Sequence, residues 1–222
     1  MLAVRPPDYF PPVAHAVLLA SAGHVVLADT FAFSRQAAHN RARILTSQGP
    51  QWITVPRDHA PVGTSMARVG VVADGWVRRH VAALQSAYGM APYAEHVLPE
   101  VAALLAGRHA SLGALAAATT AWSLARLGAS VRVDLASAMA GAPDTLAGVW
   151  VAAGRPDVRT LPATLARDRA ALEPLGASVA VLDWPEPPRR QVWPGAFTAD
   201  LSVLDVLMTY GPDARVVLGR GE

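Results

Sequence analysis

The chain opens with two short apolar runs on either side of a helical segment. Residues 2–4 form one run, which stops before a pair of prolines, and residues 24–28 form the second. Between them, residues 13–22 have the length and composition of a helix, and Gly23 is a typical stop residue. Proline cannot donate to a sheet ladder, so the first strand ends before Pro6. The pattern predicts a strand–helix–strand unit, the usual beginning of a parallel sheet.

Further apolar runs and helical periods follow along the chain. Alternating or β-rich runs predict strands over residues 44–46, 51–55, 68–72, 131–135, 178–183 and 214–218. Helical patterns with caps or stop residues predict helices over residues 76–88, 93–97, 100–106, 112–127, 144–154, 161–175 and 200–210. Strands that alternate with helices favour an α/β fold. We expect a single domain over residues 1–222, with a mostly parallel or mixed central sheet flanked by helices and a helical middle segment.

Composition removes several kinds of chemistry. Of the 222 residues, 52% are hydrophobic, so a folded core is expected. The chain has no cysteine, and its 19 Lys and Arg positions are all arginine. Disulfides, thiolate nucleophiles, Schiff-base lysines and the lysine of phosphate-binding loops are therefore excluded.

Net charge and motif spacing limit the kinds of partner that the chain is expected to bind. The net charge is +2 and acidic residues are spread along the chain, which predicts no nucleic-acid-binding stripe. The apolar stretches are interrupted before the roughly 20 residues that a membrane helix needs, and the first ten residues do not resemble a signal peptide. The seven histidines lack metal-ligand spacing, and no dinucleotide-binding or nucleophile-elbow motif occurs. We expect a cytoplasmic protein without membrane insertion, metal or cofactor.

Residues 29–43 are the first candidate binding segment. An apolar run ends on Asp29, and three arginines, Arg35, Arg41 and Arg43, follow together with Asn40. Ligands of open α/β sheets lie outside the carboxyl ends of the strands, and guanidinium forks suit phosphate or carboxylate groups. The alternative is a solvated basic face that follows a buried strand.

Two other groups of residues can carry chemistry. The turn before the first helix contains Tyr9 and Phe10, with His15 in the first helical turn, where free backbone N–H groups can hold an anion. Nucleotidyltransferases also have a histidine at such a turn, but their motif has two histidines and a glycine, which this turn lacks. His80 lies four residues after Trp76, on the same helical face. It is either a general base or a packed, hydrogen-bonded histidine.

The last predicted helix carries a carboxylate on its apolar face. Asp205 lies between the apolar positions of this helix, and Ser202 lies on the same side; Thr198 or Asp200 is the expected cap. A charge that faces the core needs a partner. We expect Arg41 or Arg43 to supply it, in a pair that is either structural or catalytic.

Several short motifs occur in a fixed order along the chain. They are the proline-built turn of residues 7–11, Asp29, Phe33-Ser34, Asn40-Arg41, the stretch 52–56, Trp76 with His80, Tyr88, Ala91-Pro92-Tyr93, Gln191, Phe197 and the stretch 201–207. In this order and spacing the chain resembles the WbqC-like protein family over nearly its whole length. The resemblance implies a role in bacterial surface-polysaccharide and O-antigen biosynthesis. Some members look like transferases that place an amino acid such as glycine on the amino group of a nucleotide-linked sugar.

The chain also departs from that family's pattern. Arg5 stands where a glutamine is common, and Pro12 stands where a tryptophan is usual. The Tyr-Leu-Ser-Gly segment that the resemblance implies near residues 155–162 is replaced by a different sequence. These differences leave the acceptor specificity open.

Three hypotheses follow. The first is a transferase that acts on a small-molecule nucleotide sugar. In it, Arg35, Arg41 and Arg43 bind the phosphates, and Asn40 and Gln191 bind sugar hydroxyls. Asp29 or His80 removes the amine proton, and Asp205 is a further catalytic candidate. Further substrate contacts are expected from Tyr9, Phe10, His15, Trp76 and Ser202. The second is an ATP-dependent amide-forming or nucleotidyl-transferring enzyme that uses His15. The third is a binding protein without catalysis. The sequence does not predict the oligomeric state.

Overall fold

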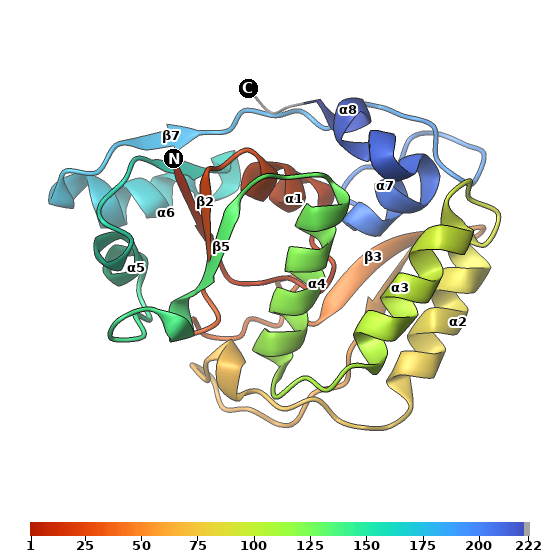
Figure 1. Cartoon of the computed structure of the whole chain (residues 1–222), viewed down its shortest axis with the longest axis horizontal. Coiled ribbons are helices and arrows are strands. Elements are labelled where there is room, and N and C mark those ends of the chain that lie inside the picture. The colour runs from red at the N-terminus through yellow and green to blue at the C-terminus, as the bar shows by residue number, and fades with distance from the viewer. Residues whose placement is uncertain (220–222) are drawn as a thin grey trace.

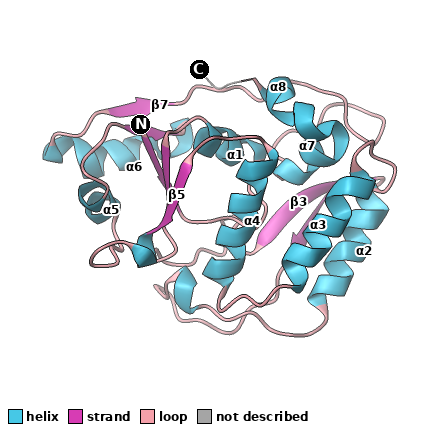
Figure 2. Cartoon of the chain, in the orientation of Figure 1, coloured by secondary structure: helices cyan, strands magenta, loops and turns pink. Residues whose placement is uncertain are grey.

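The computed structural model describes residues 1–219 and is built on a five-stranded parallel sheet with helices on both faces (Figures 1 and 2). The strand order is β5-β2-β1-β6-β7, so β1 is central and all four pairings are parallel. The strands are β1 Leu2–Arg5, β2 His24–Leu27, β5 Arg132–Leu135, β6 Val158–Thr160 and β7 Val179–Val181. The predicted class, a mostly parallel central sheet flanked by helices, is confirmed.

Some of the helices cover the two faces of this sheet, and the others build a separate packed region. They are α1 Val13–Ala20, α2 Trp76–Tyr88, α3 Ala94–Ala106, α4 Leu112–Arg126, α5 Leu146–Ala152, α6 Pro162–Leu172, α7 Val203–Tyr210 and α8 Ala214–Leu218. On one face, Ala3 and Val25 pack with α1, α7 and α8. On the other face, Leu2 and Val26 pack with α5 and α6. Neighbouring residues of β1 and β2 thus face opposite layers, which explains why these strands are continuously apolar.

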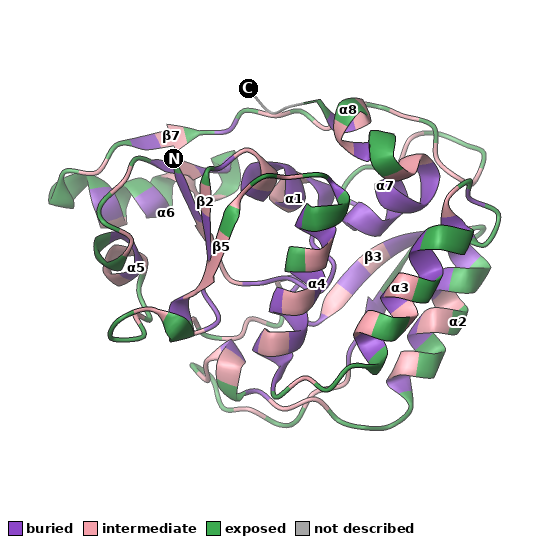
Figure 3. Cartoon of the chain, viewed as in Figure 1, coloured by how far each residue is buried: buried purple, intermediate pink, exposed green. Residues whose placement is uncertain are grey.

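The middle of the chain builds a second packed region beside the sheet. Strands β3 Arg41–Thr46 and β4 Gly49–Thr54 form an antiparallel hairpin, separate from the parallel sheet. Helices α2, α3 and α4 surround a core with the hairpin that includes Ile44, Leu84 and Tyr88. Figure 3 shows the buried stripes of these helices on the sides that face one another. The predicted helical middle segment is confirmed.

Gly113 sets how closely α4 approaches the short 3-10 helix Met66–Arg68. A Cβ at Gly113 would lie 2.9 Å from the carbonyl carbon of Met66 and 3.0 Å from the amide nitrogen of Ala67. Backbone cannot move aside as a flexible side chain can, so Gly113→Ala is expected to lower the free energy of unfolding by about 1–3 kcal/mol. Urea unfolding measures the change. In the control Gly23→Ala the new Cβ meets only Met1 O at 3.9 Å, and an equal loss there would contradict the prediction.

Two predicted strands are wrong. Residues 68–72 contain no strand: Val69 and Gly70 follow the 3-10 helix, and only Val71 forms an isolated bridge, with Arg57. The Asp58 N–H donates to the Gly70 carbonyl and the Val72 N–H donates to the Pro56 carbonyl, so this stretch pairs with residues 56–58 around a single bridge and not as a strand. Residues 214–218 form α8 instead. Ala214 and Leu218 are buried one helical turn apart, and a segment of five residues, four of them apolar, is too short to distinguish this period from a strand.

Three further predictions differ from the structure: the bounds of one helix, an unpredicted strand and the cap of the helix α7. The two helices predicted over residues 93–97 and 100–106 form one helix, α3 Ala94–Ala106, with Pro99 inside it. The stretch 155–162 contains strand β6, which the sequence did not predict. Helix α7 is capped by Ser202, whose Oγ accepts from the Leu204 N–H, whereas Asp200 has a φ of 58° outside the helix.

Candidate functional site

The carboxyl ends of β1 and β6 mark the point where the strand order reverses. β1 leads to β2 on one side, through α1, and the chain later returns to the other side of β1 with β6. Open parallel sheets bind ligands outside such a switch point. The polar residues that gather there come from β1 and its following turn, from α1, and from β6 and α6.

Arg5, Asp8 and His15 form the centre of this group. His15 Nδ1 lies 2.7 Å from Asp8 Oδ2. A buried carboxylate accepts, so Nδ1–H donates to Asp8. Arg5 Nη2 lies 3.0 Å from His15 Nε2 and 3.3 Å from His15 Nδ1, so it sits over the face of the ring rather than along the in-plane lone pair of Nε2. The carboxylate thus orients the imidazole through Nδ1, with the guanidinium stacked on the ring.

Asp8 is held firmly from the opposite side by α4. Its backbone N–H donates to Thr120 Oγ1, and its carbonyl accepts from the hydroxyls of Thr119 and Thr120. Burial raises the pKa of Asp8, but the hydrogen bond from His15 and the charges of His15, Arg5 and His39 outweigh it, so the pKa is lowered. Asp8 therefore stays ionised although its side chain is only 5% exposed.

Arg5 has unused hydrogen-bonding capacity. Its Nε is buried without a hydrogen-bond partner in the described chain. Burial lowers the pKa of Arg5, while Asp8 and Asp168 oppose the shift. A guanidinium remains charged at any physiological pH, so Arg5 is a buried cation with a free donor. Such a group suits a bound anion.

The β6 side adds a second arginine and a hydroxyl cluster. Thr160 at the end of β6 hydrogen-bonds both to Asp168 and to Thr164, which is 2.6 Å away between hydroxyl oxygens. Arg167 donates to Asp168 Oδ1 through Nε at 2.9 Å and Nη2 at 2.8 Å, and its side chain is 71% exposed. The charges of Arg167 and Asp168 both affect Arg5. Helix α6 begins here without a side-chain cap.

The segment 29–43 reaches this group through His39. His39 is buried, and the charges of Asp8, Arg5 and His15 influence its pKa, which burial lowers. The Ser34 N–H donates to His39 Nδ1 at 3.2 Å, so this nitrogen is the unprotonated one. The neighbouring Ala38 carbonyl accepts from the Tyr9 N–H at 3.0 Å. The segment thus closes over the turn after β1.

The three arginines predicted in this segment lie outside that group. Arg41 stacks on the Trp52 ring of the hairpin, 4.5 Å from its centroid, and donates to the Gln36 carbonyl. Arg43 donates to the Ala199 carbonyl, and Arg35 is exposed. Arg41 and Arg43 share the outer surface of the hairpin.

Several other predicted site residues make structural contacts. Asp29 accepts from the N–H and the hydroxyl of Ser137, which joins the ends of β2 and β5. Asn40 donates to the Val55 carbonyl. The N-terminus of α1 is closed by the chain itself, because the Val13 N–H donates to the Leu201 carbonyl and Ser202 Oγ donates to the Phe10 carbonyl. One backbone N–H of the expected anion site at that helix end is therefore already bonded within the chain.

His80 lies in the hairpin core with Tyr9 and Trp76, as the predicted shared face of Trp76 and His80 requires. His80 Nε2 lies 3.2 Å from the Thr54 carbonyl, so this nitrogen donates and Nδ1 accepts from the Tyr9 hydroxyl at 2.9 Å. Burial is the main cause that lowers the pKa of His80 to about 4. Both ring nitrogens are thus engaged inside the core.

The lowered pKa of His80 predicts a loss of stability in acid. An unfolded histidine titrates near 6.5, so between pH 7 and about 4 the unfolded state takes up the proton first and stability falls. The full effect is about 3 kcal/mol. Wild type and His80→Gln are compared by urea unfolding at pH 7 and pH 4, and the variant is expected to lose correspondingly less. Exposed His59→Gln is the control. Equal losses in wild type and His80→Gln would contradict the assignment.

The predicted cation for Asp205 is wrong. Asp205 Oδ2 lies 3.5 Å from Arg189 Nη2 and accepts from Gln191 Nε2 at 3.1 Å. Neither Arg41 nor Arg43 contacts it. Burial raises the pKa of Asp205, although the hydrogen bond from Gln191 and the charge of Arg189 act to lower it. The residue does face inward beside Ser202, as expected, and its partners come from the loop before α7.

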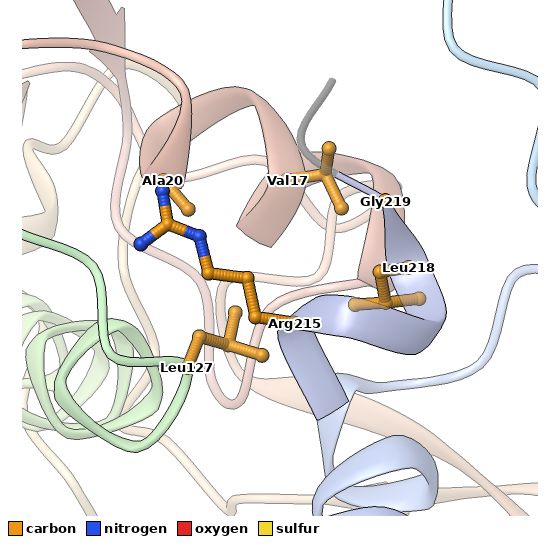
Figure 4. Close-up of a pocket in the computed structure, with 6 residues that line it drawn as sticks. All are labelled: Val17, Ala20, Leu127, Arg215, Leu218 and Gly219. Carbon is orange, nitrogen blue, oxygen red and sulfur yellow. The ribbon is translucent and has the colours of Figure 1, made fainter. Parts of the chain in front are cut away.

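Three cavities lie away from the carboxyl ends of β1 and β6, where the strand order reverses. The shallow one between α1 and α8 is shown in Figure 4, where Arg215 extends past Leu127 towards Ala20, and its volume is only about 10 Å³. One of about 290 Å³ lies beside β5, with the paired His24 and Asp134 in its lining. A third, of about 340 Å³, is lined by the loop residues 189–197. None of the three includes a residue of the Arg5–Asp8–His15 group.

Comparison with known proteins identifies relatives but no solved structure. The sequence model of the WbqC-like protein family matches residues 6–217 of this chain. An uncharacterised protein of Mycobacterium tuberculosis, Rv1507c, is 26% identical over 227 residues, which cover 96% of this chain and 95% of that protein. No solved structure matches the chain significantly. Within residues 1–219 no helix is long and apolar enough to cross a membrane, and no group of three His, Asp or Glu side chains is arranged to hold a metal.

Proposed function

Because the chain belongs to the WbqC-like protein family, we propose that it is a transferase for a nucleotide-activated amino sugar in bacterial surface-polysaccharide biosynthesis. The group transferred is an aminoacyl group, such as glycyl, and the acceptor is the amino group of the sugar. The protein acts in the cytoplasm on a small-molecule substrate.

The observation that supports this function most is the Arg5–His15–Asp8 arrangement at the strand-order switch point. A pyrophosphate needs buried or semi-buried cationic donors, and two guanidinium groups are available: Arg5 at the end of the central strand and Arg167 on α6. An amine nucleophile needs a base, and His15 has Nε2 next to Arg5. In this proposal, phosphate binding and proton removal occur at neighbouring groups.

The two contacts of His15 support its role as the base. Asp8 holds Nδ1, and Arg5 stacks on the ring. With a phosphate bound to Arg5, Nε2 accepts the proton that the neutral sugar amine loses as it attacks. The amine nitrogen then attacks the carbonyl carbon of an activated aminoacyl ester or thioester. A C–N bond forms, the C–O or C–S bond breaks, and the leaving group receives the proton from His15.

Arg41 and Arg43 take a peripheral place in this proposal. Both lie on the outer face of the hairpin that follows His39, with Arg41 stacked on exposed Trp52. They are suited to a distal part of the nucleotide or of the aminoacyl donor rather than to the pyrophosphate. We do not assign Asp29, His80, Asn40, Gln191 or Asp205 to the reaction, because each makes hydrogen bonds or ion pairs that hold the fold together.

A binding measurement tests the proposal. UDP-, GDP- and dTDP-linked amino sugars are screened by thermal shift and the best is titrated calorimetrically. Wild type is expected to bind, and Arg5→Gln, which keeps a polar side chain but removes the fork, is expected to bind about tenfold or more weakly. Arg78→Ala, an exposed arginine of α2, is the control. No binding of any nucleotide sugar to wild type, or equal binding by Arg5→Gln, would overturn the proposal.

A second candidate is the ATP-dependent amide-forming or nucleotidyl-transferring enzyme. It is favoured by the position of His15, in the first turn of the helix that follows the central strand. The closed N-terminus of α1 opposes it, because Leu201 occupies a backbone N–H there. Pyrophosphate release from ATP with candidate acids separates the two functions, and release that persists in His15→Ala would reject this second mechanism.

A further inference from the structure

A larger cleft lies at the far part of α4 and is lined by residues of α3, α4 and the turn after α7. Figure 1 shows where these elements lie in the fold. Its volume is about 540 Å³, within the usual range for small-molecule sites. It shares no lining residue with the Arg5–Asp8–His15 group. Thr120 contacts Asp8, whereas Arg126 of the cleft lies six residues later, about 9 Å along the helix.

One wall of the cleft carries a donor and an acceptor side by side. Arg126 Nε lies 2.8 Å from Glu100 Oε2, and Trp122 Nε1 donates to the same oxygen at 3.1 Å. Glu100 Oε1 and the terminal amino groups of Arg126 make no hydrogen bond within residues 1–219. Both side chains line the cleft and are partly exposed. Their charges neutralise each other, which disfavours a simple anion or cation as the ligand.

The other walls are mainly apolar. Val97, Leu207 and Pro212 contribute aliphatic surface, and Tyr93 contributes an aromatic ring. Tyr93 lies against Gly211, where a Cβ would be 2.4 Å from the ring and where φ is 51°. Only glycine allows the ring to lie there without strain. The Tyr93 N–H also donates to the Met208 carbonyl at 2.9 Å, so this wall is fixed rather than adaptable.

We propose that this cleft binds a neutral saccharide. Adjacent hydroxyls of a sugar ring offer a donor and an acceptor a short distance apart, which match Glu100 Oε1 and the Arg126 amino groups. The C–H face of a sugar ring is apolar and weakly positive, which suits the electron-rich face of an aromatic ring such as Tyr93. An anionic ligand would meet Glu100, and a purely apolar one would give no acceptor to the terminal amino groups of Arg126. This site is separate from the proposed transferase site and does not depend on its function.

The test is NMR titration of the whole chain with neutral sugars. N-Acetylglucosamine, galactose, rhamnose and a linear trisaccharide such as maltotriose are titrated into ¹⁵N-labelled protein. At least one is expected to shift the amide signals of residues 93–100, 125–126 and 207–212 with millimolar or tighter affinity. Arg126→Ala and Glu100→Gln are each expected to weaken that binding by about tenfold. Arg78→Ala is the matched exposed-arginine control.

The outcomes separate this site from the transferase site. Arg126→Ala is expected to bind nucleotide sugars as wild type does, whereas Arg5→Gln is expected to bind the neutral saccharide as wild type does. The proposal is overturned if no neutral sugar shifts the cleft signals, or if only phenol or benzoate, added as aromatic probes, does so. Sugar binding that Arg126→Ala and Glu100→Gln both leave unchanged would also overturn it.

Discussion

Replacing Arg189 with alanine is expected to lower the free energy of unfolding by about 3–5 kcal/mol, which is the usual cost of breaking a buried charge pair from one side. The Arg189 side chain is only 2% exposed and lies 2.7 Å from Glu186 Oε1 and 3.5 Å from Asp205 Oδ2. It also lies over the Phe197 ring, at 5.1 Å. Its loss leaves two buried carboxylates without their cation.

Thermal and urea unfolding measure this loss. For a chain of this length the melting temperature is expected to fall by about 10 °C. Arg190→Ala is the control, since this neighbouring side chain is exposed and only its backbone carbonyl is bonded, to the Tyr210 hydroxyl. A variant as stable as Arg190→Ala would show that the cluster contributes nothing to the free energy of unfolding.

The pH dependence of the same variant gives a second test. Burial raises the pKa of Asp205 in the folded protein, so the folded state holds its proton more readily than the unfolded state. The contribution of this group is present below the unfolded pKa and is lost as pH rises through the folded pKa. Without the Arg189 cation, more stability is lost when the Asp205 carboxyl ionises. Arg189→Ala is therefore expected to be closer to wild type in stability at pH 4–5 than at pH 7.

The case of Asp205 shows how far sequence reasoning reaches. Its place on the core side of the last helix follows from the helical period, and the need for a partner follows from the cost of a buried charge. Which partner it finds depends on how the irregular loop of residues 185–199 folds back onto α7. Proline-rich segments without a hydrophobic period give no such information, so the sequence pointed to Arg41 or Arg43 while the structure has Arg189.

The candidate site is hidden from the sequence for a related reason. The first strand–helix–strand unit is predictable, and with it Asp8 and His15 near one turn. Arg167 and Asp168 join them only because β6 pairs with β1, across more than half of the chain. β6 is three residues long and carries no distinctive pattern. The sequence marked Arg5 only as a departure from the glutamine that is common at this position in the family. In this chain, Arg5 supplies the guanidinium of the candidate site.

Replacing His15 with glutamine is expected to lower the kcat of aminoacyl transfer by about 10²–10⁴-fold, the usual contribution of a general base. Glutamine can still donate to Asp8, which preserves the turn, but it has no basic nitrogen to accept the amine proton. KM for the nucleotide sugar is expected to change little, because Arg5 and Arg167 retain their charges. The rate is measured by mass spectrometry of the acylated sugar, with the nucleotide sugar found in the binding screen.

His24→Gln is the matched control for this measurement. His24 Nε2 lies 2.8 Å from Asp134 Oδ2, so it has the same kind of carboxylate partner as His15. It differs in position, since it begins β2 and therefore lies at the amino end of the parallel strands, where such sheets do not place catalytic groups. A similar fall in kcat in both variants would mean that His15 acts through the fold. A fall confined to His15→Gln, with KM for the nucleotide sugar nearly unchanged, supports proton transfer by His15.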